Sequence, residues 1–534
     1  MTWYQSCPHS AYWPEPIEGF YQATGGQGYG TPLAPRAPHL SLSDIMFMTG
    51  VMSSPQRPWG IVTWMAEMFG VSRQTVYDLT ERVRQQFSLS PITAPVIPSD
   101  EGRRLQRTVL TAAFPGKMAI RPMQEVMQEA FGVSRSVGWI SELLTEAGGR
   151  AGRILADVPL AQLGPVLVVR DEKFFQNKPI LMVIEPVSAA ILGIWALPDR
   201  QAETWALALT ELTDRDLQIA GVVEDMARMY DKSQDLADLD LPSQEDIWHL
   251  LRDAGQLLKD LERRAYRAMK KSYKLEKKLQ KAWDDARFDQ YVTTVAEEER
   301  LCSLHQEFSE WLSHLADVFE LVDERSGEIR DREINGWLLD EVIRALTAIE
   351  IPEVRRFARR LDRHQDALLT FLDWLTLRLQ PFYEQLAHLL PSPADQNRFI
   401  RLAARYWRLL QALTNGRTHV RTWLDDLSQE LETWFAFYPQ LRPLAQHLTQ
   451  ALNAATRSSA MIENINGLLA QFLVNRRSFR NDVTRQNYLN LFALWHNMRP
   501  FARGKRQGQS PYQHAGIDLG SDDWLTLLGY PPAV

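Results

Sequence analysis

The chain has 534 residues, which at about 150 residues per domain predicts three to four domains and excludes a single small binding module. Hydrophobic residues make up 45% and charged residues 23% of the chain, so most of it can bury a core rather than stay disordered. The 59 Lys and Arg against 66 Asp and Glu give a net charge of −7, which excludes a uniformly basic nucleic-acid coat but leaves local basic patches open.

Cysteine content and hydropathy indicate where the protein works. Only Cys7 and Cys302 are present, too few for a disulfide framework or a four-thiolate zinc site. A reducing compartment is therefore expected. No run of 18 apolar residues occurs, and the chain does not start with a charged segment before an apolar stretch. These features predict a cytoplasmic protein with no membrane segment.

The N-terminal region contains a repeated phrase. Residues 1–40 are rich in Pro, Gly and Tyr without periodicity and are expected to form a flexible arm. Residues 41–150 then show helical patterns, with Phe-Gly-Val-Ser-Arg at 69–73 and again at 131–135. In each copy an apolar helical stretch runs into Gly, and Ser72 or Ser134 is placed to cap a second helix. The pattern predicts a tandem helix-turn-helix region over 41–150.

A helix-turn-helix unit suggests a DNA contact. The second helix of such a unit can enter the major groove with its N-terminal residues against base edges. That geometry would place these residues at DNA: Arg73, Gln74 and Thr75 in the first copy, Arg135 and Ser136 in the second. The alternative is two ordinary helical hairpins that do not contact DNA.

Residues 160–250 change to strand periodicity. β-branched and apolar runs at 166–169, 179–184 and 189–195 predict three strands in series. A helix over 200–212 and a fourth strand over 219–223 follow, and a further short strand is expected near 246–248. The predicted order is β, β, β, α, β, the first part of a catalytic core.

Residues 251–457 read as amphipathic helix after helix, an all-α insertion domain. Within it, Lys259 to Lys281 carries ten Lys and Arg against three Asp and Glu. This run is either a solvated helix face or a contact for backbone phosphates.

The last region, 458–517, is predicted to complete the core and to carry a basic tail. A helix is expected over 460–477. Between residues 475 and 506, eight Lys and Arg stand against one acid, with aromatic residues interleaved. Such a stretch offers charge for phosphates and ring faces for bases or packing. Residues 518–534 form a C-terminal extension.

Two aspartates occupy similar places in the predicted sheet. Asp171 directly follows the first strand and Asp225 follows the fourth. If those strands are neighbours, the two carboxylates lie side by side and repel each other unless a cation sits between them. The pair therefore predicts a divalent metal site suited to phosphoryl transfer. Glu224 and Glu172 are rival ligands, but strand alternation should turn both to the opposite face.

A third acid comes from the helix near the end of the chain. Glu463, Asn466 and Ala470 share one side of it, while Ile462, Ile465, Leu469, Phe472 and Leu473 form an apolar stripe on another. Glu463 could thus face the metals while the stripe packs on the sheet. The alternative is an exposed helix glutamate.

These residues resemble a known family. Asp171, Asp225 and Glu463 on a strand meander resemble the Asp-Asp-Glu triad of bacterial insertion-sequence transposases of the DDE, RNase H-like superfamily. The segment Ser458-Ser459-Ala460-Met461-Ile462-Glu463-Asn464-Ile465-Asn466, followed by Asn475-Arg476-Arg477 and by His496-Asn497-Met498-Arg499-Pro500-Phe501, is similar to the end of such enzymes.

The resemblance implies an RNase H-like mixed sheet with flanking helices, interrupted by the all-α insertion. It implies that Asp171, Asp225 and Glu463 hold two Mg²⁺ ions, for which Mn²⁺ can substitute. Its substrates would be double-stranded transposon ends and target DNA, cut and then joined through a freed 3′-hydroxyl, in a homodimeric DNA complex in the bacterial cytoplasm and nucleoid. The expected phosphate contacts are Arg476, Arg477, Arg499, Arg503, Lys505 and Arg506.

One departure from compact family members is the spacing of the acids. Asp225 and Glu463 are 463 − 225, or 238, residues apart, so the helical insertion must lie between them. Two other functions stay open: a sequence-specific DNA-binding regulator with a decayed core, and a metal-dependent nuclease that cuts structured nucleic acid without strand transfer.

Overall fold

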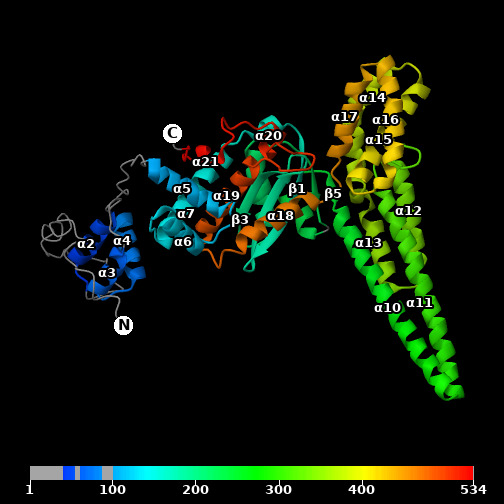
Figure 1. The fold of residues 1–534 in the computed structure, drawn as a ribbon, viewed down its shortest axis with the longest axis horizontal. Coiled ribbons are helices and arrows are strands. Elements are labelled where there is room, and N and C mark those ends of the chain that lie inside the picture. The colour runs from blue at the N-terminus through cyan, green and yellow to red at the C-terminus, as the bar shows by residue number, and fades with distance from the viewer. Residues whose placement is uncertain (1–39, 54–59, 87–99, 226, 533–534) are drawn as a thin grey trace. The chain divides into compact units, whose positions relative to one another are not determined.

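The computed structural model describes residues 40–53, 60–86, 100–225 and 227–532, coloured in Figure 1. The predicted arm at 1–40 lies almost wholly outside the described residues. The chain divides into two compact units. One contains the described residues up to 108 together with 124–140, and the other contains 109–123 and 141–531. Each unit is described by itself below.

The first unit contains the first predicted helix-turn-helix. Helices α2 (Leu42–Ser53), α3 (Ile61–Met68) and α4 (Arg73–Gln86) pack around a shared apolar core. The turn between α3 and α4 uses Gly70 at φ 64°, a conformation that favours glycine. The Ser72 hydroxyl accepts a hydrogen bond from the Thr75 amide at 3.0 Å, so Ser72 is the helix cap that the sequence predicts.

The second copy of the phrase folds differently from the prediction. Helix α5 (Asp100–Ala113) is followed by α6 (Ile120–Phe131), Gly132 at φ 63° and α7 (Val137–Ala156). The predicted cap at Ser134 is wrong by two residues, because the Trp139 amide donates to Ser136 Oγ at 3.0 Å. The Arg135 carbonyl accepts a hydrogen bond from Gln124 and so lies outside the helix.

A five-stranded mixed sheet forms the centre of the second unit (Figure 1). Its strands are β1 (Val166–Phe175), β2 (Lys178–Glu185), β3 (Ala190–Ala196), β4 (Ile219–Glu224) and β5 (Ser243–Glu245). The strand order is β3-β2-β1-β4-β5. Strand β2 is antiparallel to both of its neighbours, β1 and β3, whereas β4 and β5 are parallel to β1. The predicted β, β, β, α, β order is confirmed, with α8 (Ala202–Asp214) as the helix.

The fifth strand lies slightly earlier than expected. It ends at Glu245, whereas Ile247 and Trp248, expected to be strand, begin helix α10. The reason is a cap: the Asp246 side chain accepts a hydrogen bond from the Trp248 amide at 2.8 Å, which starts a helix there.

Helices from both sides of the insertion cover the sheet. The helix α9 (Arg228–Leu236) packs on α8, α18 (Ala460–Leu473) packs on β1 and β2, and α19 (Asp482–Met498) packs on β3. Helix α7 in turn approaches α19 closely, because a Cβ at Gly148 would come within 2.2 Å of the Asn487 carbonyl oxygen. Short helices η1 (Leu160–Leu163), α20 (Pro511–Ala515) and α21 (Trp524–Leu527) complete this part.

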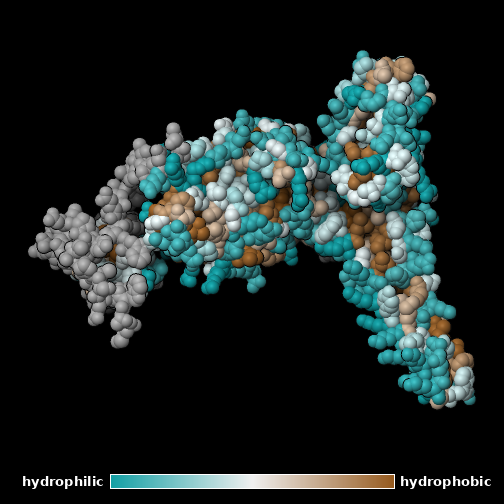
Figure 2. Space-filling model, in the orientation of Figure 1, coloured by the Kyte–Doolittle hydropathy of each residue, from teal (hydrophilic) through white to brown (hydrophobic). Residues whose placement is uncertain are grey.

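The region between Asp246 and Ser459 is helical, as the sequence predicts. Its elements are α10 (Ile247–Lys281), α11 (Asp285–Val318), α12 (Arg332–Ala348), α13 (Pro352–Leu368), α14 (Thr370–Leu389), α15 (Pro393–Thr414), η2 (Thr418–Val420), α16 (Arg421–Phe437) and α17 (Leu441–Ala454). Helices α10 and α11 form a long pair (Figure 1). The α10 side of this pair, where the lysine run lies, is hydrophilic in Figure 2. No helix of the described residues has the length and apolar character to cross a membrane.

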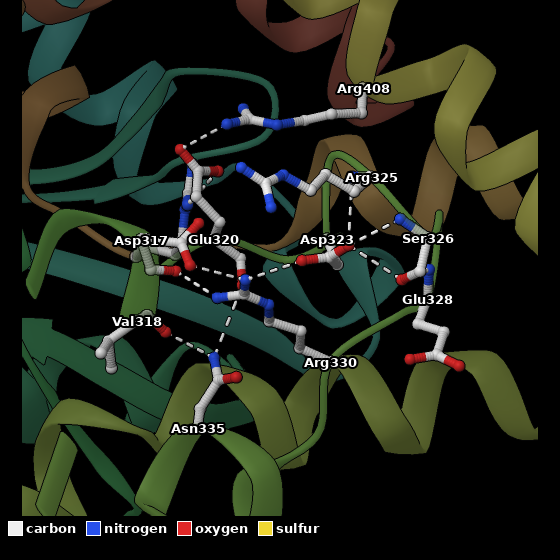
Figure 3. Close-up of polar contacts among 11 residues, drawn as sticks. Asp317, Val318, Glu320, Asp323, Arg325, Ser326, Glu328, Arg330, Asn335 and Arg408 are labelled. Carbon is white, nitrogen blue, oxygen red and sulfur yellow. Dashed lines mark hydrogen bonds and ion pairs between the residues drawn. The ribbon is translucent and has the colours of Figure 1, made fainter. Parts of the chain in front are cut away.

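The connection between α11 and α12 is a compact polar joint, shown in Figure 3. The buried Arg330 guanidinium donates to the Asp317 carboxylate at 2.7 Å and to Asp323 at 3.3 Å. Glu320 forms ion pairs with Arg408 of α15 at 3.0 Å and with Arg457, just before α18, at 3.3 Å. One loop of the insertion is thereby tied both to a neighbouring helix and to the segment that leads back to the sheet.

Candidate active site

The pairing of β1 with β4 places the two predicted aspartates at neighbouring positions. In the parallel register Val169 is opposite Val223, so two residues further along each chain lie Asp171 and Asp225. Asp225 follows the end of β4, as predicted. The prediction that Asp171 also follows its strand is wrong, because β1 continues to Phe175 by pairing with β2, where Asp171 is opposite Met182.

The rival ligand Glu224 is used elsewhere. Alternation along the strand turns Arg170 and Glu224 to the other face of the sheet, where both are buried and form an ion pair. The Arg170 guanidinium also donates to Ser233 at 2.7 Å and lies 4.5 Å from the centre of the Tyr230 ring. Glu224 is therefore part of the core and is not available as a ligand.

Glu172 is the second rival, and it too has partners within the fold. Its carboxylate accepts a hydrogen bond from the Tyr230 hydroxyl at 2.7 Å and forms an ion pair with Arg200. It still lies close enough to Asp225 for its charge to raise the pKa of that aspartate. Glu172 thus adds negative charge to the site while its oxygens are occupied.

Helix α18 brings Glu463 to the same end of the sheet. The predicted stripe on this helix is buried, and the helix packs on β1 and β2. One turn after Glu463, the buried Asn466 donates from Nδ2 to Asp171 Oδ2 at 2.7 Å. This bond holds the helix against the first aspartate. The side chain of Glu463 is 39% exposed.

The pKa of Asp171 depends on the other acids nearby. Burial, then the charge of Glu463, raises the pKa of Asp171 to about 7, and Glu172 and Asp225 contribute in the same direction. Burial, followed by Glu172, raises the pKa of Asp225. The charges of the other two predicted acids, Glu463 and Asp225, therefore both act at Asp171.

The donor chemistry of the cluster fits a divalent cation. Its groups are carboxylates, the ligands that Mg²⁺ takes, and the oxygen of Asn466 is buried without a hydrogen-bond partner. A cation would relieve the repulsion that raises the pKa of Asp171. Even so, within the described ranges no three acidic, histidine or cysteine side chains already stand in an arrangement that could hold a metal ion.

A histidine that the sequence analysis missed lies beside Glu463. His249 Nε2 is 3.5 Å from Glu463 Oε1, and His249 Nδ1 contacts the Asp246 carboxylate. The hydrogen bond to Asp246 raises the pKa of His249. Asp246 also accepts a bond from the Ser459 hydroxyl; burial raises the pKa of Asp246, but the bonds from His249 and Ser459 outweigh burial and lower it. The signal in the sequence was an Asp that can cap a helix, with His three residues later.

The predicted DNA contacts in the first unit differ in placement. Arg73 and Gln74 are exposed in the first turn of α4, and Gln74 donates to Asp78 at 2.8 Å. Arg135 and Ser136 precede α7 rather than begin it, and the Arg135 guanidinium lies 5.3 Å from the Trp139 ring centre. The two copies therefore do not present equivalent residues.

Several of the predicted phosphate contacts in the tail have partners within the fold. Arg506 donates to the carbonyls of Val187 and Pro186 at 2.6 and 2.9 Å, and Lys505 donates to Asn453 at 2.9 Å. Arg476 and Arg499 lie over the rings of Tyr488 and Trp495, at 4.5 and 4.8 Å. Arg477 and Arg503 are exposed.

The His-Asn phrase that contributed to the family resemblance holds the sheet together. Asn497 accepts from the Ile191 amide and donates to the Ile191 carbonyl, both at 2.8 Å. His496 contacts the Ala189 carbonyl at 2.9 Å. Both residues thus bind the edge strand β3 at its start, which is a structural role.

Comparison with known protein families concerns the segment that carries the two aspartates. Residues 170–376 match the family model DDE_Tnp_ISL3, described as a transposase. This match supports the resemblance to insertion-sequence transposases of the DDE class that the sequence predicts. The match begins beside Asp171, includes Asp225 and ends within α14, before Glu463. None of the curated proteins compared with the chain matches it.

Proposed function

We propose that this transposase binds the ends of a mobile element, cuts DNA there and joins the freed 3′-hydroxyl to target DNA. The observation that carries the proposal is the approach of Asp225 and Glu463 to Asp171: the pairing of β1 with β4 brings Asp225 beside Asp171, and burial together with the charge of Glu463 raises the pKa of Asp171 to about 7. Acids that lie close together repel one another, and a bound cation would relieve that repulsion, which supports a cation-dependent site.

Asp171, Asp225 and Glu463 are the residues that would hold two divalent ions, Mg²⁺ or Mn²⁺. Such ions activate an attacking oxygen and stabilise a leaving oxygen in phosphoryl transfer. Within the chain, the Asn466 amide holds the Asp171 carboxylate in place. His249, which is held by Asp246, lies 3.5 Å from Glu463 and would orient that carboxylate.

An RNase H-like core is part of the proposal. A sheet of order β3-β2-β1-β4-β5, with only β2 antiparallel to its two neighbours, supports it, because acids on β1 and after β4 then meet at one end. The helical insertion between β5 and α18 supports it also, since the third acid returns from 238 residues away (463 − 225) to the same end.

DNA recognition is assigned to the helix-turn-helix region. Arg73, Gln74 and Thr75 at the start of α4 are placed to meet base edges if α4 enters the major groove. Arg135 and Ser136 would contact the backbone rather than bases, since they precede α7. In the tail, the exposed Arg477 and Arg503 are the better phosphate contacts. Assembly as a homodimer on the two element ends, in the bacterial cytoplasm, completes the proposal.

The test uses the full chain and a plasmid that carries the sequences flanking its gene. Asp171→Asn, Asp225→Asn and Glu463→Gln should each abolish cleavage in Mg²⁺ or Mn²⁺ while DNA binding persists. Asp214→Asn, which alters an exposed carboxylate on α8, is the matched control and should cleave normally. Normal cleavage by Glu463→Gln would remove that residue from the site.

The same reactions separate the alternatives. A DNA-binding regulator would bind the flanking sequences and leave them uncut with either metal, as with EDTA. A nuclease without transfer activity would cut but would form no joined product with a target plasmid. Joined products in Mg²⁺ that disappear with Asp225→Asn support transposition.

A further inference from the structure

A cavity of about 650 Å³ begins at Asp225 of the acid cluster and extends away from it. The first two turns of α10 form one wall, and α13 forms the other; the two helices pack against each other and run side by side in Figure 1. The cavity is lined by five arginines: Arg252, Arg356, Arg359, Arg360 and Arg363. A positively lined cavity thus adjoins a negatively charged site.

Four of these arginines lie on one face of α13 because of their spacing in the sequence. Arg356, Arg359, Arg360 and Arg363 follow an i, i+3, i+4, i+7 spacing and so share one face. The other face packs into the insertion, where Val354, Ala358 and Leu361 are buried. A core-facing helix needs polar residues on its outer face, but that need does not specify arginine at four positions in register.

Three of the four acids that line the cavity have partners, and the fourth, Asp225, belongs to the acid cluster. Asp253 forms an ion pair with Arg360 at 2.8 Å, and Glu353 forms one with Arg264 at 2.5 Å. Asp246 is held by His249 and Ser459. These carboxylates therefore do not cancel the remaining arginines.

Arg252 lies 3.9 Å from the Asp253 carboxylate and 4.9 Å from the centre of the Trp248 ring, so three of the five arginines are left without a partner of this kind. Arg356, Arg359 and Arg363 are exposed, and none of them makes an ion pair with any residue that the structure describes. Their effect on the neighbourhood is visible at His364: burial, then the charges of Arg360 and Arg363, lower the pKa of its ring. The cavity thus has an excess of fixed positive charge with no internal partner.

A phosphodiester chain matches this arrangement in charge and in length. From Arg356 to Arg363 the helix rises about 10 Å, at about 1.5 Å per residue. Successive phosphates of one strand in duplex DNA rise about 3.4 Å, so this face is long enough for roughly three of them. A strand with one phosphate at the acid cluster would continue directly past Asp225 into the arginines.

We propose that the groove between α10 and α13 binds the sugar–phosphate backbone of the DNA strand next to the phosphate that is cut, through Arg356, Arg359 and Arg363. This inference rests on the proposed function, because it takes the acid cluster as the point of cleavage. It gives the insertion a direct role in holding the substrate strand. Contacts of this kind are independent of base sequence.

The experiment measures the salt dependence of DNA binding by the full chain. Fluorescence anisotropy with a labelled mixed-sequence duplex, in Ca²⁺ to prevent cutting, gives the slope of log K against log salt. Each of Arg356→Gln, Arg359→Gln and Arg363→Gln should lower the magnitude of that slope by about one, and the triple variant by about three. Thermal unfolding confirms that the variants fold.

The matched control is Arg355→Gln, on the same helix but outside the cavity, where the side chain donates to the Thr347 carbonyl. It should leave the slope unchanged. An equal decrease for Arg355→Gln and Arg359→Gln would overturn the inference, as it would mean general surface charge. An unchanged slope in the triple variant would also overturn it.

A second readout separates this inference from the proposed function. Asp225→Asn should abolish cleavage and keep the wild-type slope, whereas the triple arginine variant should retain metal-dependent cutting at saturating protein and lose it as salt rises. If the triple variant shifts the slope while Asp225→Asn cuts normally, the groove binds DNA and the assigned cleavage site is wrong. If Asp225→Asn is inactive and the arginine variants match wild type, the site stands and the groove assignment fails.

Discussion

Protonation of a buried histidine should destabilise the sheet-bearing unit in mild acid. His496 is buried in α19, donates to the Ala189 carbonyl, and has a pKa that burial lowers from its usual 6.5 to about 4. Because the folded pKa is the lower one, the stability is fully present above pH 6.5 and is lost as the pH falls through 4. The difference of 6.5 − 4 corresponds to about 3 kcal/mol in total and about 2 kcal/mol at pH 5.

Urea unfolding at pH 7.5 and pH 5 measures this effect, and His496→Gln removes it. The glutamine amide can still donate to the Ala189 carbonyl, but it does not titrate. Other acids and histidines contribute equally to both proteins, so they cancel in the comparison. Wild type should lose about 2 kcal/mol more than His496→Gln between the two pH values. Equal losses in the two proteins would refute the reasoning.

Three further predictions concern packing and caps. Gly148→Ala should lower the free energy of unfolding by about 1–3 kcal/mol, because its Cβ would lie 2.2 Å from the Asn487 carbonyl oxygen of α19. Gly149→Ala should be neutral or stabilising in the same urea assay, because its Cβ would make only an ordinary contact with the Asn487 side-chain nitrogen at 3.8 Å. Arg170→Met should lower the free energy of unfolding by about 3–5 kcal/mol, because it leaves the Glu224 carboxylate buried without its ion-pair partner. The double variant Arg170→Met, Glu224→Leu should recover part of this loss, and no recovery would argue against the pairing of the two residues. Ser136→Ala should lower the melting temperature, with a loss of about 1 kcal/mol in the free energy of unfolding, while Ser134→Ala should leave both unchanged. The reverse result would mean that Ser134 is the cap, as the sequence predicts.

Much of the sheet could be predicted because its signal is local. Strands β2 to β4 are runs of β-branched and apolar residues, and they begin and end within a residue or two of the expected bounds. Strand β1 extends beyond its apolar run, because β2 continues to pair with it through polar residues as far as Phe175. Local hydropathy gave no sign of that extension.

The parts of the site that sequence reasoning missed depend on contacts between distant segments. His249 contacts Glu463 across 214 residues (463 − 249), and Asn466 contacts Asp171 across 295. The partners of the tail arginines are equally distant: the carbonyls that bind Arg506 lie in the turn between β2 and β3, 319 and 320 residues away. No periodicity in a single sequence encodes such partners.

The long insertion need not disturb the acids, because its two ends meet. Asp246 caps the first insertion helix and also accepts a bond from Ser459, and the Ile247 amide donates to the Arg457 carbonyl at 3.3 Å. The excursion therefore leaves and re-enters the core at one point, one turn of helix before Glu463. Closing a longer loop adds only slowly to the entropic cost, since that cost grows with the logarithm of length. The position of Glu463 thus depends on this junction and on the packing of α18 against β1 and β2, and the number of helices in the insertion does not set it.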